Sequence, residues 1–112
     1  MKQDRNLGGL ESMLMLAVLR LGDHAYGVTI RRELLERAHK DVAIGAIYTG
    51  LERLERKDFV VSRLGEPTQE RGGRAKRYYQ LTASGLRALN DTQRAMQGLM
   101  AGLPLVGGNA DA

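Results

Sequence analysis

Cysteine is absent from this sequence of 112 residues, which excludes disulfide bonds and thiolate metal sites. His24 and His39 are the only histidines, and two imidazoles so far apart in the chain predict no metal site. Ser12, Ser62 and Ser84 lie in no nucleophile-elbow context, and no histidine is placed to activate them. We therefore expect no metal, no cofactor and no enzymatic activity.

Long apolar runs are also missing. The most apolar stretch, residues 13–19, is followed at once by Arg20 and is too short to span a membrane. The first residues mix charges and lack the apolar core and the small-residue cleavage site of a signal peptide. We expect a cytoplasmic protein without a membrane partner, and the lack of cysteine fits a reducing compartment.

Acidic residues are outnumbered, with 13 Asp and Glu against 17 Lys and Arg, and the net charge is +4. This balance suits a polyanionic partner but does not identify one. The position of the charge is more informative, because residues 71–77 hold four cations and no carboxylate. The length predicts a single domain with a modest core.

Apolar periodicity predicts three helices, a two-stranded hairpin and a fourth helix, in that order. We expect the helices over residues 7 or 10 to 21, 26–38 and 44–57, the strands over 59–64 and 76–81, and a last helix after Thr82 that ends before Pro104. The predicted fold class is α+β, mainly α: a winged helix-turn-helix with a C-terminal dimerisation helix.

The same reading gives an expected domain organisation. We expect a flexible N-terminal arm over residues 1–6, a winged helix-turn-helix DNA-binding domain over 7–82, a dimerisation helix over 83–104 and a disordered tail over 105–112.

The third predicted helix has two contrasting faces. Its large apolar residues form one stripe, Ile44, Ile47, Leu51 and Leu54. The other face carries small residues and then arginines, which lets a helix backbone approach the bases in the major groove. The alternative is that glycines such as Gly50 serve close packing against another helix. We predict that the recognition helix contacts DNA through Gly45, Ala46, Tyr48, Thr49 and Arg53, with Arg56 equally well explained as a solvated residue.

The connection between the two strands is basic and loosened by glycine. Cations on such a hairpin can follow a phosphate backbone or enter a minor groove, although solubility is the alternative role. Arg77 has a further option, since its strand position could point it inward towards a carboxylate. The predicted DNA contacts of this wing are Arg71, Gly72, Gly73, Arg74 and Lys76.

The first and last helices have apolar surface beyond what one small domain covers. The last helix carries a heptad-like apolar seam interrupted by Gln93. Met13, Met96 and Met100 could line an adaptable ligand cavity, but dimer core is the favoured reading. The predicted dimer interface comprises Leu10, Met13, Leu14, Leu86, Leu89, Gln93, Met96, Met100 and Leu103.

Several stretches together resemble the PadR family of bacterial transcriptional regulators, in its short form with a single C-terminal helix. They are Leu10-Glu11, Tyr26-Gly27-Val-Thr-Ile30, Ala46-Ile47-Tyr48-Thr-Gly-Leu51-Glu-Arg53-Leu54, Gly72-Gly73-Arg74 and Arg77-Tyr78-Tyr79-Gln-Leu81-Thr82-Ala-Ser-Gly85. The sequence departs from the family pattern at Asp58, where a glycine is usual, and at Ala43, where a small hydroxyl often caps the third helix.

The resemblance implies a homodimer joined through its terminal helices, which represses transcription at a roughly palindromic double-stranded operator and is often released by a small apolar or aromatic effector. It also permits a phosphate contact by the Tyr26 hydroxyl, although a half-buried packing role suits that tyrosine equally. The alternative function is a winged-helix protein-interaction module that lacks specific DNA recognition.

Overall fold

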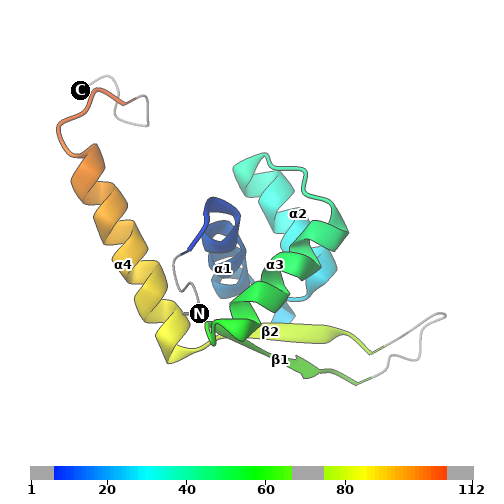
Figure 1. Ribbon diagram of the computed structural model, residues 1–112. Helices are drawn as coiled ribbons and strands as arrows, with labels where there is room; N and C mark the ends of the chain where they lie inside the picture. The colour runs from blue at the N-terminus through cyan, green and yellow to red at the C-terminus, as the bar shows by residue number, and fades with distance from the viewer. Residues whose placement is uncertain (1–6, 67–74, 106–112) are drawn as a thin grey trace.

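The computed structural model describes residues 7–66 and 75–105, and within them four α-helices accompany a two-stranded antiparallel sheet (Figure 1). The elements in chain order are α1 (Gly9–Leu21), the short 3-10 helix η1 (Gly22–His24), α2 (Gly27–Ala38), α3 (Ile44–Arg56), β1 (Val60–Leu64), β2 (Arg77–Leu81) and α4 (Ala83–Met100). The mainly helical α+β class is confirmed. The predicted arm (1–6), the wing tip (67–74) and most of the tail (106–112) lie outside the described residues.

The core lies where α1, α2 and α3 pack together over the start of the sheet (Figure 1). Its largest fully buried side chains come from all three helices and from β1, and they are Leu14, Met15, Ile30, Ile47, Leu51, Leu54, Phe59 and Val60. The apolar stripe predicted for α3 is therefore the face that turns into the core. Burial of that stripe leaves the small-residue face of α3 outside.

Left-handed backbone marks two element ends. His39 ends α2 with a φ of 56°, and Asp58 follows α3 with a φ of 66°. Asp is one of the few residues that tolerate this region, which explains how Asp58 replaces the glycine usual there. The second departure, Ala43, leaves α3 without a side-chain cap at its start. Asp41 does not supply that cap, because its carboxylate pairs with Arg31 at 3.3 Å.

The two strands form a ribbon whose register runs from Val60 opposite Leu81 to Leu64 opposite Arg77. A short bridge joins β2 to the residues before α2, where the Tyr79 N–H donates to the Ala25 carbonyl oxygen at 2.9 Å. The ribbon is thus fixed to the helices at one end and extends away from them at the other (Figure 1).

Among the described residues, the last helix, α4, packs against the rest of the domain through its first turns. Thr82 caps it as predicted, because its hydroxyl oxygen accepts from the Gly85 N–H at 2.9 Å. Gly85 and Leu89 are its buried residues, and beyond them the helix extends away from the packed helices (Figure 1). It ends at Met100 rather than continuing to Pro104, so the prediction overextended it.

Candidate nucleic-acid interface

The outer face of α3 presents four of the predicted DNA contacts side by side on the surface. Gly45, Ala46, Thr49 and Arg53 are all exposed, while Ile47 and Leu51 on the opposite face are completely buried. A helix with one buried apolar face and one exposed face of small residues can lie against a large, flat or grooved partner. The structure therefore brings these four residues together, as their spacing predicted.

Gly50 follows Thr49 and is one of the small residues that the sequence places opposite the apolar stripe, but the structure turns it towards α1. It is buried, and a Cβ atom there would lie 2.5 Å from Leu14 Cδ1 of α1. The packing explanation therefore applies to Gly50, whereas Gly45 has open space where its Cβ would be. The sequence could not separate them, because a small residue suits both a helix contact and an open face.

Tyr48, the fifth predicted contact on α3, reaches back to the start of α2. A Cβ on Gly27 would lie 2.5 Å from its ring carbon Cζ and would overlap the hydroxyl oxygen. The tyrosine is still 41% exposed, so its ring has both a packed edge and a free edge. With Tyr48 in this position α2 has no room for a side chain at Gly27, a relation that the sequence alone did not reveal.

A groove separates the outer face of α3 from the first turn of α1. The α3 side is formed by Ala46, Thr49, Gly50 and Arg53 and the α1 side by residues 7–11, with Lys57 at one end. Thr49 and Arg53 thus border a recess rather than a featureless helix surface. A ligand that reached both would also meet the start of α1.

A buried ion pair, which sequence reasoning missed, holds this groove together. Lys57 Nζ donates to both carboxylate oxygens of Glu11, at 2.8 and 3.0 Å, and the Gly8 N–H donates to Glu11 Oε1 at 2.9 Å. Burial alone would raise the pKa of the Glu11 carboxyl, but these hydrogen bonds hold that pKa below its usual range. The pair fixes the end of α3 to the start of α1.

The base of the wing is described from residue 75 onwards. Lys76 Nζ lies 5.2 Å from the ring centre of Tyr26, and that ring meets Tyr78 edge-on at 5.5 Å. Arg63 lies over the other tyrosine of this pair, with its guanidinium carbon 4.9 Å from the ring centre of Tyr78. Tyr26 is half-buried, as one of its two predicted roles required. Arg71, Gly72, Gly73 and Arg74 lie outside the described residues.

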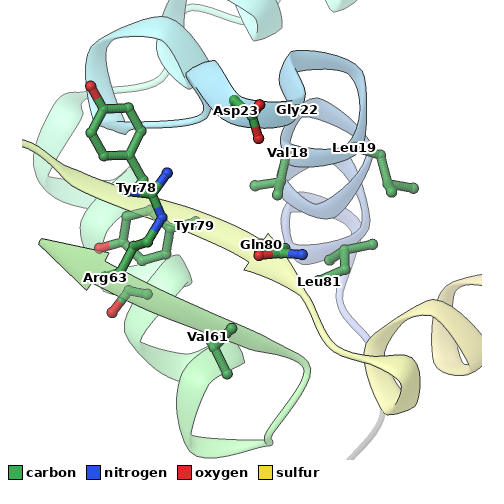
Figure 2. Close-up of a pocket in the computed structure, with 11 residues that line it drawn as sticks. Val18, Leu19, Gly22, Asp23, Val61, Arg63, Tyr78, Tyr79, Gln80 and Leu81 are labelled. Carbon is green, nitrogen blue, oxygen red and sulfur yellow. The ribbon is translucent and has the colours of Figure 1, made fainter. Parts of the chain in front are cut away.

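A hollow of about 290 Å³ lies between the end of α1 and the outer face of the ribbon (Figure 2). Leu19 and Val61 face it from opposite sides, and Arg63 and Gln80 add polar groups. A second hollow of about 170 Å³ includes Met13 and lies between α1 and α2. Neither hollow includes Met96 or Met100, the other methionines of the predicted ligand cavity.

The residues predicted for the dimer interface divide into two groups. Leu14 and Leu89 are buried within the single chain, so their packing needs no partner. Leu10 and Met13 are half-buried, and the α4 residues and those that follow it are exposed: Leu86, Gln93, Met96, Met100 and Leu103. The surface open to a partner is thus centred on α4 and on the first turns of α1.

Within residues 7–66 and 75–105, no group of three or more His, Cys, Asp or Glu side chains is arranged to hold a metal ion. Nor does any helix in that part of the chain combine the length and apolarity that a membrane span requires.

Three helices, an exposed third helix and an antiparallel ribbon beside it define a winged helix-turn-helix protein. The family model described as the transcriptional regulator PadR-like family matches residues 15–91, and the chain belongs to this family. The predicted relationship and fold are thereby confirmed. A comparison with curated proteins finds no match.

Solved structures agree with this assignment. A PadR-like transcription factor from Bacteroides fragilis is 31% identical, with 80% of this chain and 82% of that one covered and a TM-score of 0.67. A PadR family regulator from Clostridium difficile R20291 is 28% identical, with coverages of 82% and 95% and a TM-score of 0.65. Bacillus subtilis PadR in complex with operator DNA shares the fold at 22% identity, with 76% of this chain and 46% of that one covered and a TM-score of 0.62.

Proposed function

We propose that this protein is a sequence-specific, double-stranded-DNA-binding transcriptional regulator that acts as a dimeric repressor and is released by a small apolar or aromatic effector. The observation that carries the proposal is the outer face of α3, where Gly45, Ala46 and Thr49 are exposed beside Arg53. Small side chains allow the helix backbone to approach base edges, and an arginine further along can reach a phosphate. The operator-bound structure of Bacillus subtilis PadR supports the same use of the fold.

The base of the ribbon supports a second contact with the duplex. Lys76 lies there, directly before β2, and Arg71 and Arg74 precede it in the sequence. In this proposal these cations hold phosphates beside the groove that α3 enters. Phosphate contacts of this kind fix the position of a protein on DNA but do not read its sequence.

Dimerisation through α4 and the first turns of α1 would present two copies of α3 to one duplex. Two such helices read half-sites about one helical turn apart, roughly 34–36 Å. The operator is then roughly palindromic, because the two-fold symmetry of the protein is repeated in the DNA. The exposed apolar residues of α4 support this arrangement.

Binding can be tested with the DNA upstream of the protein's own gene, using fluorescence anisotropy at several salt concentrations and random DNA for comparison. Thr49→Ala should change the preference among operator variants, because Thr49 is assigned to base contact. Arg53→Ala should weaken binding to all sequences and reduce the salt slope by about one unit.

The matched control for Arg53→Ala is Arg94→Ala, which removes one positive charge from the exposed surface of α4. It should leave the salt slope almost unchanged. Equal, salt-weakened binding of the native chain to operator and random DNA would favour the protein-interaction module instead. Thermal shift across apolar and aromatic compounds tests effector release, and a chain that no compound stabilises would contradict that part of the proposal.

A further inference from the structure

A chain of hydrogen bonds joins the end of α3 to both strands of the ribbon. The Ser62 hydroxyl on β1 donates to Glu55 Oε2 on α3 at 2.7 Å, and Arg77 Nη1 on β2 donates to Ser62 Oγ at 3.1 Å. A serine hydroxyl has one proton to give and lone pairs to receive with, so Ser62 makes both bonds at once. Both partners are charged, which shortens and strengthens such bonds.

Each of the three side chains comes from a different element, α3, β1 or β2. Arg77 is the first residue of β2 and directly follows Lys76 at the base of the wing. Ser62 is the residue opposite Tyr79 in the register, on the sheet face that turns its tyrosine into the core. Glu55 lies on the helix that also carries Thr49 and Arg53. The hydrogen bonds therefore connect the proposed DNA-reading helix to the start of the proposed DNA-gripping hairpin.

Apolar packing holds the inner part of the ribbon and ends near Ser62. Val60 and Tyr79, the residue opposite Ser62, are buried in the core, whereas Leu64 at the outer end is 61% exposed. Between Val60 and Leu64, the Ser62 hydroxyl bonds to Glu55 of α3. The contact of Tyr26 with Tyr78 supports the ribbon from α2 instead.

We propose that Ser62 is a positioning residue which, with Glu55 and Arg77, sets the angle between the wing and α3 so that both reach the same DNA duplex. This inference rests on the proposed function. The hydroxyl links two oppositely charged side chains from different elements, so its loss frees the ribbon to change its angle without exposing the core. Arg77 is exposed and donates to the Ser62 hydroxyl, which in turn donates to the Glu55 carboxylate.

If the inference holds, neutralising Glu55 and neutralising a neighbouring glutamate of α3 should change the affinity for DNA in opposite directions. A carboxylate near DNA repels phosphates, so neutralising an ordinary surface glutamate should tighten binding. Glu52 is such a residue: it is exposed one turn earlier on α3, and no hydrogen bond or ion pair of its side chain occurs among the described residues. Glu52→Gln should therefore tighten binding. Glu55→Gln should weaken it, because the bond that orients the ribbon loses its charged acceptor.

The serine itself is tested by a second pair of variants in the full-length chain. Ser62→Ala should weaken operator binding about three- to tenfold, the range expected from one hydrogen bond, with unchanged preference among operators. The thermal midpoint should fall only slightly, because both bonds of Ser62 are exposed. Ser62→Thr keeps the hydroxyl in a residue suited to strands and should restore binding. Gln80→Ala removes a polar side chain from the other face of the ribbon and should have no effect.

A double variant tests whether Glu55 acts on binding through Ser62. In the Ser62→Ala background, Glu55→Gln should tighten binding as Glu52→Gln does, because only its charge still matters. The inference is overturned if Glu55→Gln tightens binding in the native chain, or if Ser62→Ala and Ser62→Thr bind alike. Failure of the native chain to prefer its operator over random DNA would instead refute the proposed function.

Discussion

Gly45 and Gly50 lie on the same helix but meet opposite surroundings. Gly50 faces the Leu14 side chain of α1, while a Cβ atom on Gly45 would meet nothing within 4 Å. Glycine inside a helix lowers its stability by roughly 0.5–1 kcal/mol relative to alanine. Packing explains that loss at Gly50. At Gly45 no neighbour among the described residues explains it, which agrees with the proposed approach of this face to DNA.

Gly45→Ala should therefore separate stability from binding. We expect the free energy of unfolding to rise by up to about 1 kcal/mol, since alanine stabilises the helix and meets no neighbour. Affinity for the operator should fall, because the added methyl group separates the helix backbone from the base edges. Urea unfolding and anisotropy titration of the same preparation measure both quantities. A variant that is more stable and binds equally well would exclude close approach at Gly45.

Glu11 gives a prediction with a definite pH dependence. Its folded-state pKa is lowered by the Gly8 and Lys57 hydrogen bonds, so its ionised form stabilises the fold above the unfolded value of about 4.5. That stabilisation should disappear as the pH falls through the lower folded pKa. Glu11→Gln should reduce the free energy of unfolding at pH 7 by about 1–3 kcal/mol and should flatten its acid dependence.

The measurement is urea unfolding at pH values from neutral to acidic. Glu36→Gln is the control, because Glu36 is exposed and no ion pair of its side chain occurs among the described residues. If both variants lost stability in parallel with the native chain as the pH fell, the pair of Glu11 with Lys57 would not be the cause.

Periodicity predicted each element but not the contacts between them. The stripe of Ile47, Leu51 and Leu54 was readable because each buried helix face repeats every three or four residues. The pairing of Glu11 with Lys57 was not, since it joins residues 46 positions apart and leaves no local pattern. The two roles of Gly45 and Gly50 were likewise hidden, because only the packed structure distinguishes an open face from a helix contact.

At the scale of elements, α4 depends on a close contact at its first turn. A Cβ atom on Gly85 would lie 2.8 Å from the Phe59 carbonyl carbon and would overlap the carbonyl oxygen. Backbone cannot move aside as a flexible side chain can. The glycine therefore fixes how near α4 comes to the start of the ribbon, and so the direction in which the helix leaves the domain.

Gly85→Ala should displace α4 and destabilise the chain by about 1–3 kcal/mol, the usual range for forcing extra volume into packed structure. Gly98→Ala is the control on the same helix, where nothing lies within 4 Å of the added Cβ. It should stabilise the helix by up to about 1 kcal/mol. Thermal unfolding of both variants compares them directly, and equal effects would contradict the role of the Phe59 contact.

The residues at which a helix begins and ends depend on capping hydrogen bonds and packing contacts, which the sequence indicates only in part. Thr82 was recognisable as a cap because its hydroxyl precedes an apolar repeat. The apolar repeat of α4 continues to Leu103, but its last turns are exposed among the residues that the structure describes. The helix ends at Met100 before the repeat does, since periodicity records a preferred face and not the contacts that stabilise it.

At the scale of the whole molecule, α4 has apolar side chains that the rest of the described residues leave uncovered. Leu86, Met96 and Met100 are exposed along one side, and Leu99 is 77% exposed. A surface of this kind on a small protein marks an interaction site. A second copy of α4 is the partner that also gives two recognition helices, which is why the dimer and the DNA site form one hypothesis.

That hypothesis can be tested by placing a charge on the apolar side of α4. Met96→Glu should convert the dimer into monomers in sedimentation or light-scattering measurements, because a carboxylate would be buried without a partner. Ala95→Glu adds the same charge at the neighbouring residue, about 100° around the helix, and should leave the dimer intact.

Binding to a full operator should fall steeply for Met96→Glu while binding to a half-site persists, since each monomer keeps its own α3 and wing. A native chain that is monomeric and still binds the full operator tightly would show that one copy suffices, and the apolar side of α4 would then need another explanation.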